Sequence, residues 1–397
     1  MQKRLAVLST HPIQYQAPWF RALAAQPGAS LEVLFCHKAT PREQAAAGFG
    51  VEFDWDVSLV EGYAHSFLRN VARQPGLNRF AGLDTPEIAN IIKEKSFDAV
   101  IINGWHYKSA WQAMRACWQT KTPVLARSDS HLHTDRGLIK RSMKRPLYRW
   151  FIPKLDACLP VGRWSRDYFL HYGARNERVF VVPHTVDDKR FANEALLWIS
   201  KRDELRARWG LNSNATVFIF AGKFIHKKRP MDFVRALAQA SRQGAKLSGL
   251  MVGDGPLRSE CEVLAGAEAV PITFAGFLNQ SEIAQAYVAS DALVLPSDGG
   301  ETWGLVVNEA MWCGRPCFVS DRVGCAPDLI VPGETGESFT TGDVHALASL
   351  MTRYAERPEQ LRTMGDNAKR SIARCSVQAA VDGVLLAMRS VANEKNN

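Results

Sequence analysis

"GGETWGLVVNEAMWCGRPC", residues 299–317, carries two glutamates, Glu301 and Glu309, eight positions apart around Gly304. A strand-like run, 292–296, precedes it, and the apolar residues after the glycine are typical of the first turns of a helix. A strand, a glycine turn and a helix in this order indicate one step of a parallel α/β sheet. We therefore expect one carboxylate in the loop that follows a strand, and the other along the next helix.

Short apolar runs alternate with helical patterns on both sides of this stretch. In the first half the strand candidates are 4–8, 31–36, 98–102, 123–126 and 178–182, and helical patterns such as 107–118 and 163–171 lie between them. The alternation restarts in the second half, where the candidates are 215–221, 247–252, 271–275, 291–295 and 316–319. Nearly continuous apolar strands separated by helices indicate parallel sheets that are buried on both faces.

The chain length of 397 residues exceeds what one ordinary core supports. We predict an α/β protein with two Rossmann-like, doubly wound domains, 1–183 and 184–375, joined near the segment PHTVD. The last helical pattern has no strand after it, so residues 376–397 are expected to form a helix that packs back on the N-terminal domain. Because open α/β sheets bind ligands beyond the carboxyl ends of their strands, the central cleft between the domains is the expected site.

The composition is that of a soluble globular protein, with 46% hydrophobic and 22% charged residues, which argues against disorder. The charge is uneven: residues 1–183 hold 25 Lys and Arg against 15 Asp and Glu, whereas the rest holds 24 against 25. This asymmetry indicates an anionic partner for the N-terminal half. The eight cysteines lack CxxC spacing and are typical of reduced thiols in a cytoplasmic protein.

The two glutamates suit the two ends of a sugar nucleotide. A helix that begins near Gly304 directs N–H groups and the positive end of its dipole outward, where a phosphate can bind, and glycine permits a close approach. Each carboxylate can accept two hydrogen bonds from a vicinal diol. Two diols that flank a diphosphate describe a hexose and a ribose. For the spacing alone, a helix-start glutamate and a surface glutamate are the alternative.

Two further segments follow predicted strands. The segment AGKFIHKKRPMDFV, 221–234, holds Lys223 and Lys228, two cations that can clamp a diphosphate and stabilise a leaving nucleotide without a metal. The segment VGDGP, 252–256, is a glycine-rich turn between a strand and a helix. Taken alone, the first is also typical of a solvated basic loop, and the second is a common turn.

In this order the segments resemble the retaining glycosyltransferases of family four, which have the GT-B fold. The resemblance covers the C-terminal half through Gly222, Lys223, Lys228, GDGP at 253–256, AGFL at 275–278, LPS at 295–297 and the Glu-x7-Glu motif. The segment PHTVDDKRF, 183–191, looks like the hinge of that family. The resemblance implies that Glu301 contacts the donor sugar and Glu309 the ribose, while the two lysines bind the diphosphate.

The resemblance also implies roles for neighbouring residues, with three departures from the family pattern. The backbone around Trp303, Gly304 and Leu305 would meet the sugar and the phosphates, Phe277 and Leu278 would frame the base, and the glycine turns would contribute Gly222 and Gly253. Lys223 stands where arginine is usual, which leaves a point charge without a bidentate fork. The other departures are His184 in place of the hinge asparagine and Asp328 where glutamate is frequent.

The acceptor side carries weaker signals. The segment STHPIQYQAPWFRALA, 9–24, follows the first predicted strand and resembles a subset of bacterial family-four enzymes of surface polysaccharide synthesis. At that strand's carboxyl end we expect three acceptor-side residues, although a capping or turn role is the alternative: His11, Gln14 and Tyr15. Arg127 and Asp129 are further candidates, since they follow the strand after which many relatives have a functional histidine.

Two patterns match metal ligands. Asp54-Trp55-Asp56 has the Asp-x-Asp form of the other glycosyltransferase fold, and HLHTD offers His131, His133 and Asp135. The first lies in an alternating stretch that is typical of an exposed strand face. Because a helix end and two lysines already suit leaving-group stabilisation, we predict neither a catalytic metal nor a cofactor.

These features predict a metal-independent retaining hexosyltransferase that uses a UDP- or GDP-sugar and a glycan or lipid-linked acceptor, in surface polysaccharide synthesis. The resemblance implies front-face transfer, in which the departing phosphate helps to deprotonate the acceptor hydroxyl. One alternative is a nucleotide-sugar epimerase or hydrolase of the same fold. Another is a basic nucleic-acid-binding protein, with pI ≈ 9.2, but the sequence has no recognisable nucleic-acid-reading motif.

The segment RGLIKRSMKRPLYRWFIPK, 136–154, interleaves seven basic residues with apolar ones and has no acidic residue. Such a segment favours contact with an anionic membrane surface, with tryptophan inserted at shallow depth. We therefore expect a cytoplasmic protein that is peripheral on the inner face of the membrane. The alternative is a solvated helix whose apolar side packs on the sheet.

Overall fold

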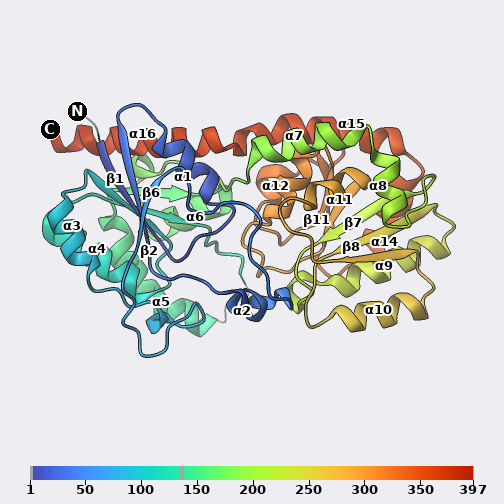
Figure 1. Ribbon diagram of the computed structural model, residues 1–397, viewed down its shortest axis with the longest axis horizontal. Helices are drawn as coiled ribbons and strands as arrows, with labels where there is room; N and C mark the ends of the chain where they lie inside the picture. The colour runs from blue at the N-terminus through green and yellow to red at the C-terminus, as the bar shows by residue number, and fades with distance from the viewer. Residues whose placement is uncertain (1–2, 135–137, 397) are drawn as a thin grey trace.

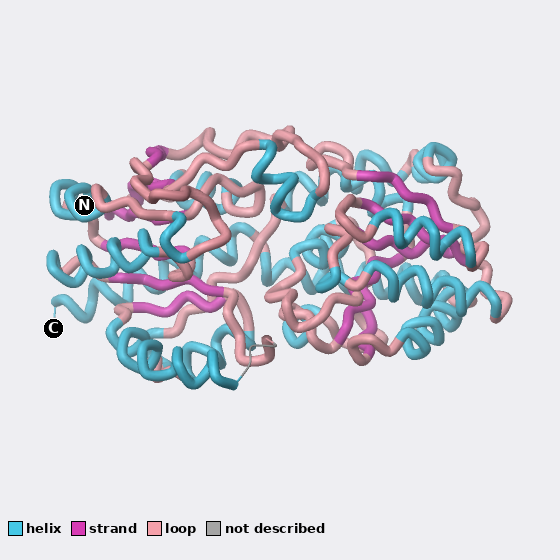
Figure 2. Tube along the Cα trace, turned by 90° about the horizontal axis from the view of Figure 1, so that it is seen from below, coloured by secondary structure: helices cyan, strands magenta, loops and turns pink. Residues whose placement is uncertain are grey.

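The computed structural model describes residues 3–134 and 138–396, apart from the side chains of 138–141 and 394–396. The chain forms two domains, each with a six-stranded sheet between helices (Figure 1). All neighbouring strands within both sheets are parallel. Loops from both domains gather between the two sheets (Figure 2). This arrangement confirms the predicted pair of doubly wound α/β domains.

The N-terminal sheet has the strand order β3-β2-β1-β4-β5-β6. Its strands are β1 (Lys3–Ser9), β2 (Ala29–Phe35), β3 (Ala64–Phe67), β4 (Ala99–Asn103), β5 (Val124–Ser128) and β6 (Ala157–Pro160). Its helices are α1 (Ala17–Ala24), α2 (Pro41–Gln44), α3 (Ile88–Lys95), α4 (Lys108–Thr120), α5 (Leu138–Phe151) and α6 (Arg163–His171). Short helical turns are η1 (Ala45–Phe49), η2 (Phe80–Gly82), η3 (Ile152–Lys154) and η4 (Asn176–Arg178).

The C-terminal sheet has the strand order β12-β11-β10-β7-β8-β9. Its strands are β7 (Thr216–Ala221), β8 (Leu247–Val252), β9 (Ile272–Gly276), β10 (Ala292–Leu295), β11 (Cys317–Ser320) and β12 (Gly336–Phe339). Its longer helices are α7 (Asp188–Ile199), α8 (Arg202–Arg208), α9 (Pro230–Arg242), α10 (Arg258–Ala267), α11 (Ile283–Ala289), α12 (Leu305–Trp312), α14 (Val344–Ala355) and α15 (Pro358–Ser371). The remaining elements are η5 (His226–Lys228), α13 (Ala326–Leu329), η6 (Ile372–Cys375) and α16 (Val377–Asn396).

Each sheet is buried on both faces, so each domain has two cores. In β1, Leu5 and Val7 pack in one core, and Ala6 and Leu8 pack in the other. This is the period of two that strand geometry imposes. It explains why strands of this kind read as continuous apolar runs in the sequence rather than as alternating ones.

The C-terminal helix α16 returns to the N-terminal domain and lies along both domains (Figure 1). Its residues Val381, Val384 and Ala387 are buried in the same core as Trp19 and Phe20 of α1. A window within 358–393 is apolar enough to pass a test for a membrane span. One side of α16 is buried against α1 and β6, whereas Leu386 on the other side is exposed, and 33% of the apolar window is buried.

The predicted strands of the second half agree with β7, β8, β9, β10 and β11 to within one residue at each end. The strand predicted at 178–182 does not form a regular strand. One bridge, between Val179 and Cys158, joins the segment to β6, and the N–H groups of Phe180 and Val182 donate to the carbonyls of Cys158 and Pro160. Three short strands were not predicted, β3, β6 and β12. β3 is mostly exposed, β6 (ACLP) ends in proline, and β12 (GESF) contains a glutamate, so none presents an unbroken apolar run.

Candidate functional site

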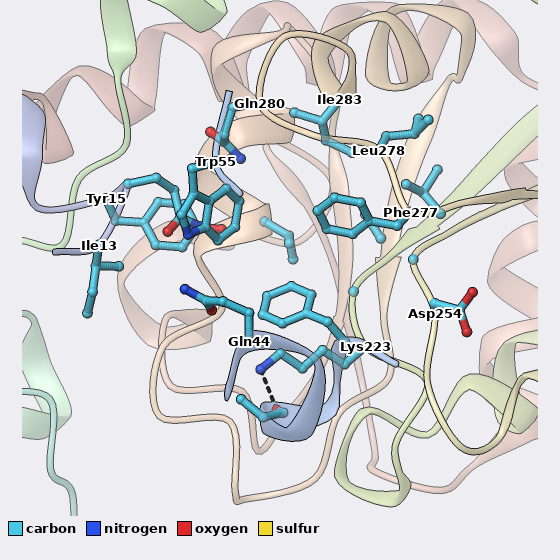
Figure 3. A pocket seen from close by; sticks show the side chains of 18 of the residues that line it. Ile13, Tyr15, Gln44, Trp55, Lys223, Asp254, Phe277, Leu278, Gln280 and Ile283 are labelled. Carbon is cyan, nitrogen blue, oxygen red and sulfur yellow. Dashed lines mark hydrogen bonds between the residues drawn. The ribbon is translucent and has the colours of Figure 1, made fainter. Parts of the chain in front are cut away.

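A cavity of about 510 Å³ lies between the two domains. Figure 3 shows side chains from both domains around it. It brings together most of the residues predicted for donor binding and three of those predicted for the acceptor side: Gly222, Lys223, Lys228, Gly253, Phe277, Leu278, Glu309, His11, Gln14 and Tyr15. Their roles remain predictions, but their convergence on one cleft follows from the carboxyl ends of two facing sheets.

Helix α12 begins at the edge of this cavity. Gly304 is its N-cap residue, with φ of +101°, in the left-handed region that favours glycine. A Cβ at this position would lie 2.9 Å from the Leu295 side chain, so the turn also needs glycine for space. The first turn of an α-helix leaves N–H groups without intrahelical partners, and its dipole favours an anion there.

Glu301 and Lys228 form an ion pair across the loop before α12 and the loop after β7. Each residue is only 9% exposed. Burial alone would raise the pKa of the Glu301 carboxyl, but the nearby Lys228 and Lys227 outweigh it, so the net pKa is lowered. An ionised carboxylate that itself lines neither cavity is therefore held beside Lys228, which lines the first one, next to the start of a helix.

Glu309 lies on the cavity side of α12 and is 2% exposed. The Tyr287 hydroxyl donates a 2.6 Å hydrogen bond to Oε2. The Tyr15 hydroxyl also lies close enough to act on the carboxylate as a donor, and Oε1 is buried without a hydrogen bond of regular geometry among the described residues. Burial raises the pKa of this carboxyl. The Tyr15 hydroxyl is close enough that burial and Glu309 raise its own pKa well above 10. An orphaned acceptor oxygen at a cavity wall suits a ligand hydroxyl.

Lys223 reaches across the cleft to the N-terminal domain. Its Nζ donates to the Ala47 carbonyl at 2.7 Å and lies 4.1 Å from the centroid of the Phe49 ring. Burial, with repulsion from Lys227 and Lys228, lowers its pKa to about 8. Lys223, which stands where the family usually has arginine, is therefore a cation that loses its charge as the pH rises through about 8.

Trp303 does not line the cavity with its side chain. It is 3% exposed, and its Nε1 donates to the Asn308 amide oxygen at 2.9 Å. Asn308 in turn donates to the His184 carbonyl at 3.0 Å. The Trp303 side chain therefore anchors α12 to the segment between the domains, and only the backbone at this position is left for a ligand.

A second cavity of about 270 Å³ adjoins the first, with Tyr15 at the border of both. Its lining includes the two remaining acceptor-side candidates, Arg127 and Asp129, together with Leu305. Asp129 accepts from Thr302 Oγ1 at 2.7 Å and lies 4.0 Å from His184 Nε2. Burial opposes ionisation of Asp129, but His184 and Thr302 outweigh it and hold its pKa far below the usual range.

Several residues around the cavities were not predicted, and some had a usable signal. Asn103 is the last residue of β4, His106 follows it closely, and both line the second cavity. Ligands bind beyond the carboxyl ends of strands in such sheets, so the reasoning that selected Arg127 would also have selected these two residues. Tyr287 lines the first cavity from α11 but lies in an apolar helical run, IAQAYVA, so nothing in the sequence distinguishes it from a core residue.

In the Asp-x-Asp pattern, considered above as a metal site, Asp56 binds backbone N–H groups of the C-terminal domain. Asp56 accepts hydrogen bonds from the backbone N–H groups of Gln280, at 3.0 Å, and Ser281, at 3.1 Å. Asp135 lies outside the described residues, and His133 packs on Trp164 with ring centroids 4.3 Å apart. Among residues 3–134 and 138–396, no three His, Cys, Asp or Glu side chains are placed to hold one metal ion.

Two protein-family models match the chain. The model described as "Glycosyl transferase 4-like domain" matches residues 12–185, and the one described as "Glycosyl transferases group 1" matches residues 201–371. N-acetyl-alpha-D-glucosaminyl L-malate synthase of Bacillus anthracis is 32% identical over 187 residues, 46% of this chain and 47% of that protein. D-inositol 3-phosphate glycosyltransferase of Thermomonospora curvata is 29% identical over 298 residues, 71% and 67% of the two chains. The chain thus spans about half the length of the first of these relatives.

Solved structures with the same fold cover nearly the whole chain. A glycosyltransferase from Rickettsia africae has a TM-score of 0.75 at 16% identity and covers 98% of this chain and 99% of its own. Anabaena HepE in complex with UDP and glucose has a TM-score of 0.70 at 18% identity, with coverage of 98% and 100%. At these identities the likeness shows the fold, and it confirms the predicted GT-B architecture.

Proposed function

The chain belongs to the GT4-like glycosyltransferases of group 1, and we propose that it transfers a hexose from a nucleotide-diphosphate sugar to a glycan or lipid-linked acceptor. The observation that carries the proposal is the orphaned Oε1 of buried Glu309 in a cavity that also holds Lys223 and Lys228. The oxygen suits a ribose hydroxyl, and the cations suit a diphosphate. A sugar nucleotide carries a ribose and a diphosphate, so it needs an acceptor oxygen and cations in the same cleft.

We propose retention of configuration without a metal. The bond between the anomeric carbon and the phosphate oxygen breaks, and the acceptor oxygen forms the new bond on the same face. The acceptor proton passes to the departing phosphate. Lys228, Lys223 and the start of α12 stabilise the negative charge that develops there, and Glu301, ionised beside Lys228, accepts hydrogen bonds from the sugar.

The second cavity is the proposed acceptor site, because it adjoins the donor cavity and holds the ionised Asp129. Relatives differ in what their names say they act on, L-malate in one and D-inositol 3-phosphate in another, so the family does not fix the acceptor. The basic N-terminal domain favours an acceptor displayed on an anionic surface, as in polysaccharide synthesis at the cytoplasmic face of a membrane.

Helix α5 is the proposed membrane contact. Met143, Leu147 and Trp150 are exposed by 75%, 44% and 51%, while its opposite side is buried through Tyr148 and Phe151. Lys154 lies 3.8 Å from the Trp150 ring centroid, which places a cation beside the exposed apolar stripe. Arg136, and the side chains of Leu138, Lys140 and Arg141, lie outside the described residues. Exposed tryptophan and basic residues on one helix suit shallow insertion into an anionic surface.

A thermal-shift screen with UDP- and GDP-sugars tests the donor proposal. One donor is expected to raise the melting temperature, since a ligand at a hundredfold excess over its Kd stabilises the fold by about 2.7 kcal/mol. With that donor alone, an epimerase would convert the sugar and a hydrolase would release it, whereas the proposed enzyme needs an acceptor for turnover. Stabilisation by oligonucleotides, with no response to any sugar nucleotide, would overturn the proposal.

A further inference from the structure

One segment of the N-terminal domain, residues 45–56, rests on the C-terminal domain, and we call it the clasp. Hydrogen bonds join the C-terminal end of the clasp, at Asp54 and Asp56, to the C-terminal domain. Asn279 Nδ2 donates to the Asp54 carbonyl at 2.8 Å, and the Asp56 carboxylate accepts the Gln280 N–H at 3.0 Å. Asp56 also accepts the Ser281 N–H at 3.1 Å. These bonds fasten the clasp to the loop that follows Phe277 and Leu278, the residues predicted to frame the base.

The near end of the clasp packs on two loops predicted to contribute to donor binding, the one with Lys223 and the turn at 252–256. Gly48 and Gly50 both have positive φ, +98° and +74°, which glycine adopts without strain. A Cβ at Gly50 would lie 3.1 Å from the Gly255 nitrogen, so the two backbones touch. Lys223 donates to the carbonyl of Ala47 in the same turn, at 2.7 Å.

An aromatic cluster joins the clasp to the base-framing loop. The Phe53 and Phe277 ring centroids are 4.2 Å apart, and Phe49 meets Phe277 edge-on at 5.8 Å. Trp55 contacts both clasp phenylalanines, at 4.8 Å from Phe53 and 6.0 Å from Phe49. All the rings are only half-buried, so the cluster is not a sealed core.

Trp55 and Phe49 line the first cavity together with Phe277 and Leu278. Figure 3 shows Trp55 and Phe277 projecting into the same space, with Lys223 below them. An aromatic wall at the end of a cavity, beyond its cations, is a surface on which a flat heteroaromatic base stacks. The wall comes from both domains, whereas the sequence assigned the donor to the C-terminal domain alone.

We propose that the clasp is part of the donor site: Trp55 and Phe49 contact the nucleobase, so that a bound nucleotide holds the two domains together. The inference rests on the proposed function, since it takes the ligand of this cavity to be a nucleotide. Lys223 then turns from the Ala47 carbonyl to the diphosphate when the donor binds. The clasp gives the N-terminal domain a share in donor affinity in addition to its share in the acceptor site.

The test compares two probes, a nucleoside diphosphate (UDP or GDP) and inorganic pyrophosphate, by calorimetry on the full chain. Trp55→Ala is expected to weaken the nucleotide about tenfold, because base stacking on an aromatic ring carries that order of affinity. Pyrophosphate has no base, so its affinity should stay within twofold of the wild-type value. Trp55→Leu keeps apolar bulk and should weaken the nucleotide in the same way. Phe80→Ala, which removes an exposed ring that lines neither cavity, is the matched control.

The outcomes separate the clasp from the proposed function. If wild-type protein binds nucleotide and both Trp55 variants bind it equally well, the clasp does not contact the base and serves only to join the two domains. Equal losses for nucleotide and pyrophosphate would overturn base contact as well, because they indicate a collapsed site. If wild-type protein binds neither UDP nor GDP, the proposed function itself fails.

Discussion

Among single residues, Lys223 links donor binding to pH most directly. Because burial and two neighbouring lysines lower its pKa to about 8, it is charged below that pH and neutral above it. The diphosphate needs the charged form, so donor affinity should change little below pH 7 and fall as the pH rises through 8. Lys223→Arg should abolish the fall, since arginine stays protonated there. Binding titrations from pH 7 to 9 measure this, and the same fall in both proteins would exclude Lys223 as its source.

The two glutamates should differ in what their substitution removes. Glu301→Gln is expected to lower turnover on the order of a hundredfold, because it removes a charge beside the reacting centre. Glu309→Gln should mainly weaken the free nucleoside diphosphate, as an amide replaces the acceptor aimed at the ribose. Kinetics and nucleotide titrations of both variants separate these effects, with the exposed Glu334→Gln as control. Normal values for both variants would mean that the site lies elsewhere.

A position in the cleft was predictable where chemistry and place along the chain coincide, as for Lys228 and Glu309, which line the first cavity. It was not predictable where a residue acts by contact across the cleft. Asp56 matched a metal motif, yet it accepts N–H groups from a loop more than two hundred positions away. No local pattern records such a partner, because the contact arises only when two domains meet.

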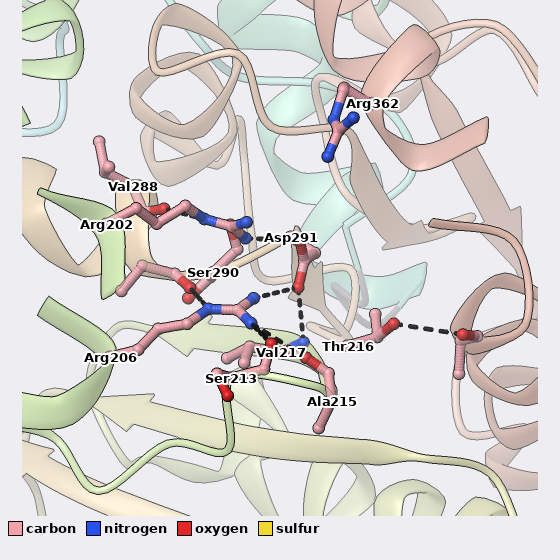
Figure 4. Close-up of polar contacts among 12 residues, drawn as sticks. Arg202, Arg206, Ser213, Ala215, Thr216, Val217, Val288, Ser290, Asp291 and Arg362 are labelled. Atoms are coloured by element: carbon pink, nitrogen blue, oxygen red, sulfur yellow. Dashed lines mark hydrogen bonds and ion pairs between the residues drawn. The ribbon is translucent and has the colours of Figure 1, made fainter. Parts of the chain in front are cut away.

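Among the elements, α8 is fixed to the C-terminal sheet by a charged cluster (Figure 4). Asp291 accepts from Arg202 at 2.5 Å, from Arg206 at 2.7 Å and from the Val217 N–H at 2.8 Å. Asp291→Asn leaves the 4% exposed Arg206 without its anion and should destabilise the domain by about 3 kcal/mol. Asp203→Asn, exposed on the same helix, is the control. Urea unfolding measures both, and equal midpoints would show that the cluster contributes nothing.

Helix α5 should determine membrane binding if the peripheral location proposed above is correct. A triple variant, Met143→Ser, Leu147→Ser and Trp150→Ser, should lose sedimentation with anionic vesicles, while the wild-type protein binds them more strongly at low salt than at physiological salt. Replacing Leu196 and Leu197, exposed by 65% and 63% on α7, should change nothing. Equal and negligible pelleting of wild-type protein with neutral and anionic vesicles would contradict the proposal.

Strands were predictable where buried residues form a mainly apolar run, as in β7, β8 and β10, which are buried along their whole length. β6 is equally buried but was not predicted. The edge strand β3, AHSF, is mostly exposed, so its pairing with β2 depends on the neighbouring strand rather than on its own pattern. The clasp has no regular pattern either, because its conformation depends on glycines and on the partner domain.

For the whole molecule, we expect sugar transfer to proceed without a divalent cation. The start of α12 and the two lysines take the place of the metal in stabilising the leaving diphosphate. Protein treated exhaustively with EDTA should therefore transfer sugar at the untreated rate. Loss of activity that magnesium or manganese restores would contradict this expectation and return attention to Asp54 and Asp56.

The central claim is that the cavity between the domains binds a nucleotide-diphosphate sugar through Glu309 and the two lysines. Calorimetric titration of EDTA-treated protein with the donor found by the screen tests it most directly, in the wild-type chain and in Glu309→Gln and Lys228→Ala. We expect saturable one-to-one binding to the wild-type protein, with the affinity lowered at least tenfold in each variant. Unchanged affinity in both variants, or no binding of any sugar nucleotide to the wild-type chain, would contradict it.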